Sequence, residues 1–457
     1  MNYKIKKMSK KIYERPILRK VVEGIPNKFG SIKKIDPIST IDNVSIDGII
    51  EKYGSPVFVL SEKTIRETYR MAYRAFSTRY PKVQFAWSYK TNYLDAVCRV
   101  FHDEGAWAEV VSGFEYEKVL DNNVPGNKII FNGPDKSEED LIRAINNKSL
   151  IHIDHFDELY TIIGLTEELK ERPQVAIRVN MDTGIYPQWD RFGFNYENGS
   201  AWNAVNRILS TGEIDLVGLH IHIGTYITLS EAYATAIEKL AALANRIFDR
   251  FQTSIGYIDI GGGFASQNTL QGAYMPATDT TPSFDDYAHA ITTAMTVVDF
   301  PNNEKPTLIL ETGRALIDDA GWLAGSVLAN KRLADGRRAM IIDAGVNLMF
   351  TAFWYNHEIY PVQETTFQSE PTTIYGPLCM NIDVIRKNID FPMLNKGDHF
   401  VIKRVGAYTM TQWMQFITYR PNIVLIDENE EVHLIRKQED KEVFRRQELV
   451  PKHLDNK

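Results

Sequence analysis

The first two thirds of the chain alternate between short apolar runs and longer segments with helical periodicity. Strand-like apolar runs occupy residues 83–89, 106–111, 128–132, 150–154, 174–179, 214–223, 256–260 and 307–311. Helix-like segments lie between them, at about 93–103, 113–121, 136–146, 156–170, 201–210, 229–251 and 283–298. Eight buried strands separated by helices are typical of a parallel α/β barrel. We therefore predict a (β/α)8 barrel of the TIM type over residues 56–315.

The pattern changes after Arg314, where strands follow one another with little helix between them. Strand-like runs lie at 322–331, 339–343, 372–378, 400–405, 422–427 and 431–436, separated by short polar or glycine-containing turns. We predict a mainly β C-terminal domain over residues 316–457, and an N-terminal extension over 1–55 that adds a strand and a helix to it. The longest unpatterned loop, residues 266–282, follows the seventh barrel strand, where it could overhang a site.

Composition excludes several classes of protein. The chain has 457 residues, of which 44% are hydrophobic and 24% are charged. Its formal charge is −7 and acidic and basic residues are interspersed, so we expect no nucleic-acid-binding surface. It contains two cysteines, which fit a reducing compartment. The first twenty residues hold eight lysines or arginines, but no apolar run follows them as in a secretory signal, and no stretch is long enough to cross a membrane. We expect a cytoplasmic protein.

Polar residues gather where the barrel strands end. The carboxyl ends of successive strands carry Lys90, Glu109, Arg178, His220 with His222, the glycines Gly261, Gly262 and Gly263, and finally Glu311 with Gly313 and Arg314. In a barrel of this kind, the carboxyl ends of the strands form the rim that holds the active site, and phosphate commonly binds after the last two strands. The sequence therefore predicts one polar site on that rim.

The residue types at this rim suit one cofactor. The glycine run can expose backbone N–H groups to an anion, and Arg314 offers a guanidinium fork to a phosphate. Burial is expected to lower the pKa of Lys90, which would ease its bonding to an aldehyde. An anionic Glu311 can keep a ring nitrogen protonated, so the set fits pyridoxal phosphate, with no metal. The structural alternatives are a solvent-facing lysine, a tight glycine turn and a Glu311–Arg314 ion pair.

At these residues the sequence resembles the alanine-racemase-fold pyridoxal-phosphate enzymes, and among them the diaminopimelate and ornithine decarboxylase family. Residues 88–92 (Ser-Tyr-Lys-Thr-Asn) are similar to the family motif whose lysine carries the cofactor. Residues 218–225 are similar to its Gly-Leu-His-x-His-Ile-Gly-Ser segment, and Glu311-Thr312-Gly313-Arg314 to its Glu-Pro-Gly-Arg. The resemblance implies that His222 stacks on the cofactor ring and that Thr225 replaces a serine at the phosphate.

Two further matches lie in the predicted β domain. Residues 376–383 resemble the family's Gly-Pro-x-Cys-x-x-x-Asp, and Gly406-Ala407-Tyr408 resembles its Gly-Ala-Tyr. In the family the cysteine comes from the second subunit as a proton donor, and the tyrosine touches phosphate. The resemblance thus implies a homodimer with shared active sites, in which Cys379 is catalytic and Tyr408 binds the cofactor.

The sequence departs from the family where the substrate's far end binds. Met380 stands where diaminopimelate decarboxylases have a glutamate, and residues 346–351 lack the arginine of the family's Asn-Asp-Leu-x-Arg-Pro segment. We therefore expect an amino acid or conjugate other than meso-diaminopimelate, with substrate contacts from Arg314, Met380, Asp383 and Tyr408.

The expected reaction is α-decarboxylation, with Lys90 bonded to the cofactor and Cys379 returning a proton to Cα. The nearest alternative is a racemase or epimerase on the same fold, which would use a tyrosine of the β domain as its second base. A catalytically silent cofactor-binding protein is a further alternative, because Met380 and Phe350 both remove substrate contacts. A cofactor-free Schiff-base aldolase barrel would leave Tyr408 and the β domain unexplained.

Overall fold

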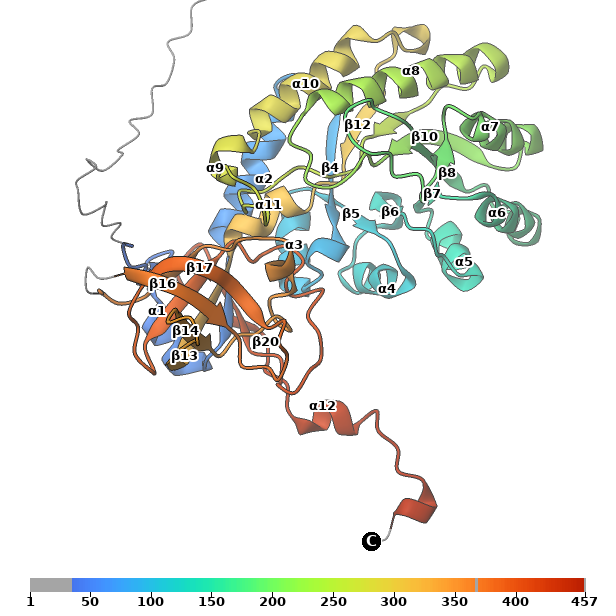
Figure 1. Ribbon diagram of the computed structural model, residues 1–457. Helices are drawn as coiled ribbons and strands as arrows, with labels where there is room; N and C mark the ends of the chain where they lie inside the picture. Colours follow the sequence, from blue (N-terminus) through green and yellow to red (C-terminus); the bar gives the residue numbers. More distant parts are fainter. Residues whose placement is uncertain (1–34, 366–368, 456–457) are drawn as a thin grey trace, which may run out of the picture.

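The computed structural model of the protein describes residues 35–365 and 369–455. Within these ranges, parallel strands close into a barrel, shown at the upper right of Figure 1. In chain order they are β4 (Val83–Ser88), β5 (Trp107–Val110), β6 (Ile129–Phe131), β7 (Leu150–Ile153), β8 (Gln174–Asn180), β10 (Asp215–Ile221), β11 (Tyr257–Asp259) and β12 (Thr307–Leu310). Pairing of β10 with β8 and of β12 with β4 completes the ring, which confirms the predicted fold class.

Helices cover the outside of the barrel between successive strands. They are α3 (Asp95–Asp103), α4 (Gly113–Asp121), α5 (Glu138–Asn146), α6 (Phe156–Leu169), α7 (Ser200–Thr211), α8 (Glu231–Phe251) and α10 (Phe284–Val297). Strands β6, β7 and β11 are buried along their whole length because side chains fill the barrel on one face and helices cover the other. This two-sided burial is why the barrel strands appear in the sequence as continuous apolar runs.

The C-terminal domain is built on a second sheet, at the lower left of Figure 1. Its strands are β13 (Gly321–Arg332), β14 (Arg338–Ile342), β15 (Ile359–Pro361), β16 (Ser369–Tyr375), β17 (Val384–Pro392), β18 (His399–Lys403), β19 (Ile423–Ile426) and β20 (Val432–Arg436). The long strand β13 pairs with β3 and β18 through residues 321–326 and with β14 through residues 327–332. It is therefore the strand on which this domain is assembled.

Strand β3 (Val57–Ser61) is where the structure departs from the predicted domain limits. It lies inside the range 56–315 assigned to the barrel, yet it pairs antiparallel with β13 and parallel with β19 in the second sheet. Helix α1 (Ile46–Tyr53) packs its buried isoleucines on the same sheet, as expected for the N-terminal region. Most of the predicted extension, residues 1–34, lies outside the described residues. The limits at 55/56 and 315/316 remain predictions, with β3 to be moved to the β domain.

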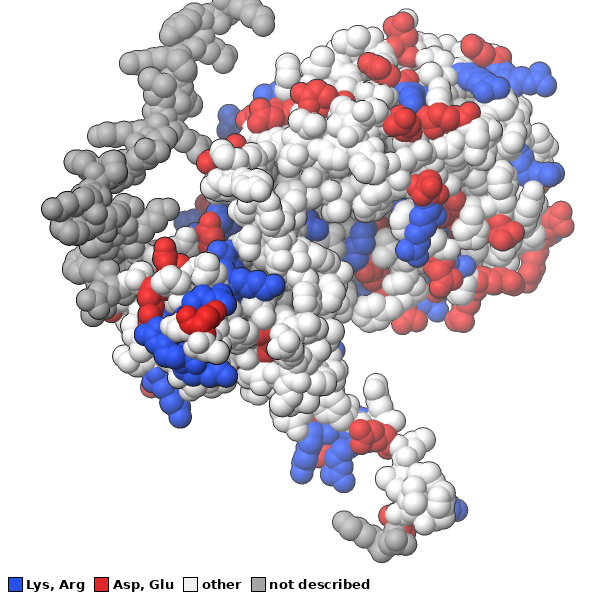
Figure 2. All heavy atoms as spheres, in the orientation of Figure 1, with Lys and Arg blue, Asp and Glu red and all other residues white. Residues whose placement is uncertain are grey.

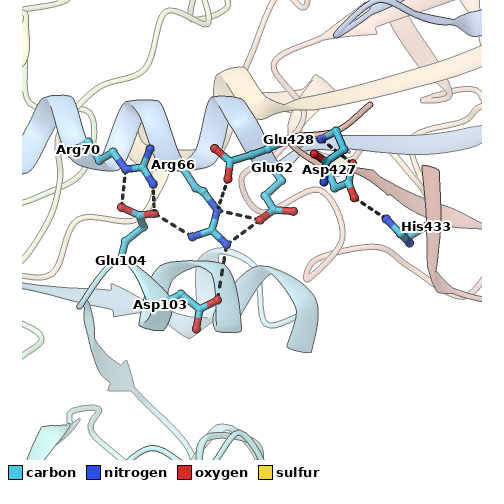
Figure 3. A network of polar contacts seen from close by, with 9 residues as sticks. Glu62, Arg66, Arg70, Asp103, Glu104, Asp427, Glu428 and His433 are labelled. Carbon is cyan, nitrogen blue, oxygen red and sulfur yellow. Dashed lines mark hydrogen bonds and ion pairs between the residues drawn. The ribbon is translucent and has the colours of Figure 1, made fainter. Parts of the chain in front are cut away.

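A network of ion pairs joins the two domains at one corner (Figure 3). Arg66 on α2 (Glu62–Ser77) contacts Glu62 at 2.6 Å and Glu104, after α3, at 2.8 Å. It also lies 3.7 Å from Glu428 in the β19–β20 turn. Arg70 pairs with the same Glu104 at 2.7 Å. Arg66 therefore holds together elements of the barrel and of the β domain.

The surface agrees with the charge pattern of the sequence. Acidic and basic side chains are interspersed over the face of the barrel visible in Figure 2. Among the described helices we find none with the length and apolarity that a bilayer span requires. The last segment, with α12 (Lys441–Arg445) and a turn at Lys452–Leu454, extends away from the body in Figure 1.

Candidate active site

The turn that carries Lys90 is built by both domains. Strand β4 ends at Ser88 and passes into a single 3-10 turn over Tyr89–Thr91. The N–H of Tyr408 donates to the Thr91 carbonyl at 2.8 Å, and the Thr411 hydroxyl donates to the Lys90 carbonyl at 2.9 Å. A Cβ at Gly313 would lie 2.0 Å from the Thr91 Oγ1, so only glycine lets the β12 loop approach this turn.

The Lys90 amine points at a buried carboxylate. Its Nζ lies 2.5 Å from Oε2 of Glu109, and the same oxygen accepts a hydrogen bond from the Ser88 hydroxyl at 2.6 Å. Burial favours the neutral amine, but the negative charge of Glu109, with smaller contributions from Tyr408 and Glu311, outweighs it and raises the Lys90 pKa. The prediction that burial would lower this pKa is therefore wrong, because it overlooked the carboxylate at the end of β5.

Lys90 opens into a cavity of about 220 Å³ at the carboxyl ends of the strands. The cavity is lined by Lys90, Glu109, Val111, Asn132, Gly133, Pro134, Arg178, Trp189, Phe192, His220, His222 and Glu311. Asn132 bridges its two acids, since its Nδ2 donates to Glu109 at 3.1 Å and to Glu311 at 2.6 Å. The amide orientation is fixed because ionised carboxylates only accept hydrogen bonds. The predicted residues Lys90, Glu109, Arg178, His222 and Glu311 thus line one cavity.

A buried polar layer supports Glu311 from the barrel interior. His220 Nε2 lies 3.4 Å from a Glu311 oxygen, and the His220 ring packs at 4.7 Å from that of His152. His152 in turn shares a 2.9 Å hydrogen bond with the Tyr257 hydroxyl. Burial lowers the pKa of both histidines well below its usual value, so both are neutral. Burial and the adjacent Glu311 raise the pKa of Asp259 well above its usual value, which favours the protonated form of Asp259.

His222 is neutral and held in place on one wall of the cavity. Burial, with the nearby cations of Arg178 and Lys90, lowers its pKa to about 3. Its Nδ1 accepts a hydrogen bond from the Gly262 N–H at 3.1 Å, and Trp189 packs against it at 5.3 Å. A neutral, flat imidazole fixed in this way can lie against an aromatic ligand.

The glycine run makes internal hydrogen bonds and close backbone contacts, and its predicted role at a phosphate stays a prediction. Gly261 N–H donates to Asp259 at 2.8 Å and Gly262 N–H to His222, so two of the three amides already have acceptors inside the protein. A Cβ at Gly262 would lie 2.5 Å from the Glu311 carbonyl, and one at Gly263 would lie 2.4 Å from the Gly224 carbonyl. All three glycines therefore allow close packing, since a Cβ at Gly261 would also lie 2.7 Å from His222 Nδ1, and the first two amides are already bonded inside the protein.

Arg314 lies under two tyrosines next to the lysine turn. Its guanidinium carbon is 4.6 Å from the Tyr408 ring centre and 5.5 Å from that of Tyr355, and it donates a hydrogen bond to the Tyr355 hydroxyl. No Glu311–Arg314 ion pair occurs among the described residues, which removes the structural alternative for these two. Thr225 is exposed at the same rim. Arg314 and Tyr408 therefore lie together beside the turn that carries Lys90.

Asp318 ties the loop after β11 to the β domain behind Arg314. The buried carboxylate accepts hydrogen bonds from the Ser266 hydroxyl at 2.5 Å, from Asn268 Nδ2 at 2.8 Å and from the Ala407 N–H at 3.3 Å. Burial raises its pKa to about 6, against the opposing charge of Arg314. The loop predicted to overhang the site is thus anchored at its first residues.

The loop with Cys379 lies apart from this cavity. Cys379 is exposed on the surface of its own chain. The Asp383 carboxylate accepts the N–H of Val346 and of Leu378, both at 2.7 Å, and a Cβ at Gly376 would lie 2.3 Å from Gly345. Both Asp383 oxygens therefore hold the loop in shape, which does not fit the predicted substrate contact. Met380 packs on the main core as a half-buried side chain.

The residues present fit pyridoxal phosphate. They offer an amine for its aldehyde, a carboxylate for its ring nitrogen and a flat neutral histidine for its ring. Sequence reasoning missed Asn132, His152, Trp189 and Asp318. For Asn132 a signal was available, because it follows an apolar strand at the same rim as the other site residues.

Comparisons with known proteins agree with this geometry. Residues 65–318 match the sequence model described as pyridoxal-dependent decarboxylase, pyridoxal binding domain. The diaminopimelate decarboxylase of Methanocaldococcus jannaschii is 30% identical over 433 residues, which cover 91% of this chain and 95% of that protein. The enzyme of the same name from Aquifex aeolicus is 27% identical over 414 residues, covering 88% and 93%.

Solved structures give the same result. The crystal structure of the M. jannaschii diaminopimelate decarboxylase has a TM-score of 0.84 at 29% identity, over 92% of this chain and 98% of that one. Its complex with L-lysine has a TM-score of 0.83 over the same shares of the two chains. A lysine/ornithine decarboxylase from Vibrio vulnificus, at 23% identity over 84% of this chain and 98% of that one, has a TM-score of 0.71 and shows the shared fold alone.

Proposed function

The chain belongs to the pyridoxal-dependent decarboxylases of the diaminopimelate and ornithine type, and we propose that it removes the α-carboxylate from an amino acid or amino-acid conjugate other than meso-diaminopimelate. It is a pyridoxal-phosphate-dependent carboxy-lyase. The observation that carries the finer proposal is the absence of charge at Phe350 and Met380, where the resemblance expects charged substrate contacts. L-Lysine bound to a similar enzyme supports an amino acid as the ligand class.

The chemistry that pyridoxal phosphate supplies when bound is an electron sink for the pair left at Cα as carbon dioxide leaves. Lys90 would hold its aldehyde and exchange it for the substrate amine. Glu109 Oε2 lies 2.5 Å from Lys90 Nζ and stabilises the protonated, cationic form of the amine. Ser88 and Asn132 keep the Glu109 carboxylate in that position.

Glu311 would keep a proton at the ring nitrogen. Burial and the adjacent Glu311 raise the pKa of Asp259, which favours the neutral form of Asp259. Asn132 and the neutral His220 orient the Glu311 carboxylate. For the phosphate we propose Arg314, Tyr408, Thr225 and the Gly263 amide.

For Cys379 we propose proton return to Cα in the site of a second copy of the chain. Its exposure on its own chain, away from the cavity that Lys90 enters, supports delivery to a partner. Mixing Lys90→Ala with Cys379→Ala protein after dissociation and reassociation tests this. Each variant alone should be inactive, whereas an equal mixture should regain about a quarter of the native activity, because about half of its dimers are mixed and one of the two sites in each contains both native residues. No recovery would contradict shared sites.

The reaction itself is tested by spectroscopy and product analysis. The visible absorption of the purified protein should change on borohydride reduction, and Lys90→Ala should lack the reducible band. Carbon dioxide release is then measured over a panel of amino acids and their conjugates, with meso-diaminopimelate included. Release from meso-diaminopimelate above all others would contradict the substrate proposal. A racemised product without carbon dioxide would favour the racemase alternative.

A further inference from the structure

Two long stretches of the β domain carry no charged side chain. Residues 344–356 and residues 406–419 contain no Asp, Glu, Lys or Arg, although charged residues make up 24% of the chain. Both stretches are instead rich in aromatic residues, which are Phe350, Phe353, Trp354, Tyr355, Tyr408, Trp413, Phe416 and Tyr419. Neither stretch itself offers a charge to a bound group. Among the described residues, the arginines that stack on these rings contact Tyr355, Tyr408 and Trp413, and not Phe350, Phe353 or Trp354.

The two stretches are packed against each other. The Met414 N–H donates to the Asn347 carbonyl at 2.8 Å, and Asn347 Nδ2 donates to the Thr418 hydroxyl at 2.8 Å. The hydroxyls of Thr351 and Thr409 lie 3.3 Å apart. They therefore form a single surface rather than two independent loops.

This surface begins beside the reactive lysine. Tyr408, whose N–H holds the Lys90 turn through Thr91, is close enough to the amine to contribute to its raised pKa. The Trp354 ring lies 6.4 Å from the Tyr408 ring, edge to face. From Trp354 the contacts continue to Phe350 at 5.5 Å. These ring contacts therefore lead from the lysine turn to Phe350.

Phe350, Phe353 and Trp354, here called the aromatic wall, remain accessible. Phe350 packs edge to face on Phe353 at 5.4 Å, and Phe353 is 38% exposed. Phe350 and Trp354 are half-buried. Because these rings are not fully buried in the core, a ligand that packs on them can bury additional apolar surface.

A short backbone ladder makes the aromatic wall rigid. Leu270 pairs antiparallel with Tyr355, the Gln271 N–H donates to the Trp354 carbonyl at 2.7 Å, and the Asn356 N–H donates to the Thr269 carbonyl at 2.8 Å. The loop after β11 thus supports the back of the wall. Preorganised rings lose little freedom when a ligand packs on them.

We propose that the far end of the substrate side chain is apolar or aromatic and packs on the aromatic wall. A terminal carboxylate or ammonium would lose its hydration there without gaining a counter-ion from either stretch, whereas an apolar group gains burial. The inference rests on the proposed decarboxylase function and names the class of side chain that this function accepts.

The test compares α-amino acids of matched side-chain length that end in methyl, phenyl, carboxylate or ammonium groups. Carbon dioxide release gives kcat and KM for the native protein and for Phe353→Ala, Phe350→Arg and Tyr160→Ala. Tyr160 is an exposed aromatic residue of α6, distant in sequence from the aromatic wall, and serves as the matched control. Light scattering reports the oligomeric state of each variant.

We expect phenyl- and methyl-ended substrates to have the highest kcat/KM. Phe353→Ala should lower kcat/KM for the phenyl-ended substrate about tenfold, mainly through KM, with the oligomeric state and the cofactor spectrum unchanged. Phe350→Arg should raise the relative kcat/KM of the carboxylate-ended substrate, and Tyr160→Ala should change neither.

Higher kcat/KM for the carboxylate- or ammonium-ended substrates would overturn the inference while leaving the decarboxylase function intact. A change of oligomeric state in Phe353→Ala without a change of substrate preference would also overturn it, because the wall would then be a subunit interface. Cofactor binding without carbon dioxide from any substrate would instead contradict the proposed function.

Discussion

Lys90 Nζ and Glu109 Oε2 lie 2.5 Å apart at the ends of neighbouring barrel strands. The pair sets the charge of the amine, because the carboxylate outweighs the burial that would otherwise favour the neutral form. A lysine at a strand end is thereby kept cationic at neutral pH, and bonding to an aldehyde first requires that proton to leave.

Glu109→Gln should lower the pKa of Lys90, because the burial remains while the opposing charge is gone. Attachment of pyridoxal phosphate to the apoprotein needs the neutral amine, so its rate at pH 7 should rise and its pH profile should shift to lower pH. Stopped-flow absorbance during reconstitution measures both. Ser88→Ala, which keeps the carboxylate, should shift the profile much less, and identical profiles for native and Glu109→Gln protein would refute the assignment.

Asn132→Leu should weaken cofactor binding and the fold together. The substitution roughly keeps the side-chain volume but leaves an oxygen of Glu109 and one of Glu311 without their shared donor, at a cost of about 1–3 kcal/mol. We expect the dissociation constant for pyridoxal phosphate to rise about tenfold, as measured by equilibrium titration of the apoprotein. Asn330→Leu, which removes a 2.8 Å hydrogen bond to Leu394 in the β domain, should leave that constant unchanged.

Asp318 should make stability fall as the pH rises from about 4 to about 6. Its folded-state pKa of about 6 lies above the ordinary value of 3.8, so in this window the native state binds more protons than the unfolded state. The contribution amounts to at most about 3 kcal/mol and is constant above pH 7. Urea unfolding of native and Asp318→Asn protein at pH 4.5 and pH 7.5 measures it, and a difference between the two proteins that does not vary with pH would exclude the shift.

Arg66→Gln should destabilise the junction between the two domains. The change removes the cation shared by Glu62 and Glu104 and leaves these acids facing each other across α2 and α3. We expect the free energy of unfolding to fall by about 1–2 kcal/mol, with a smaller loss in high salt, which screens the remaining repulsion. Arg143→Gln, whose partners Glu117 and Glu139 are exposed, is the control and should cost less than half as much. Equal losses would mean that the network contributes no more than a surface ion pair.

The barrel could be predicted from the sequence because its strands are buried on both faces. Strands such as β6 and β7 are continuous apolar runs, and the helices between them have clear periodicity. Strand β3 has the same apolar pattern and was therefore placed in the barrel range. Its partners β13 and β19 lie more than 250 residues further along the chain, so the local pattern does not reveal that it belongs to the second sheet. Strand β17 was missed because exposed polar residues such as Lys387 and Asp390 interrupt its apolar positions.

Much of the candidate site could also be predicted, because its residues follow the ends of recognisable strands. Asn132 was missed although it follows an apolar strand at the same rim, since an asparagine before Gly133-Pro134 also looks like an ordinary turn residue. The raised pKa of Lys90 depends on a 2.5 Å approach that only the paired strands β4 and β5 determine. Likewise, the acceptors of the Gly261 and Gly262 amides become visible only in three dimensions.

The hydrogen bonds from Tyr408 and Thr411 to the Lys90 turn impose an order on biosynthesis. A nascent chain can complete the eight barrel strands and still lack the backbone contacts that fix its reactive amine, because their donors are translated more than 300 residues later. Capture of the vitamin-derived cofactor in its final geometry must therefore wait until the ribosome has released nearly the whole chain. For the same reason, a barrel domain truncated after residue 315 would retain Lys90 but would lack the hydrogen bonds from Tyr408 and Thr411 that hold the Lys90 turn in position.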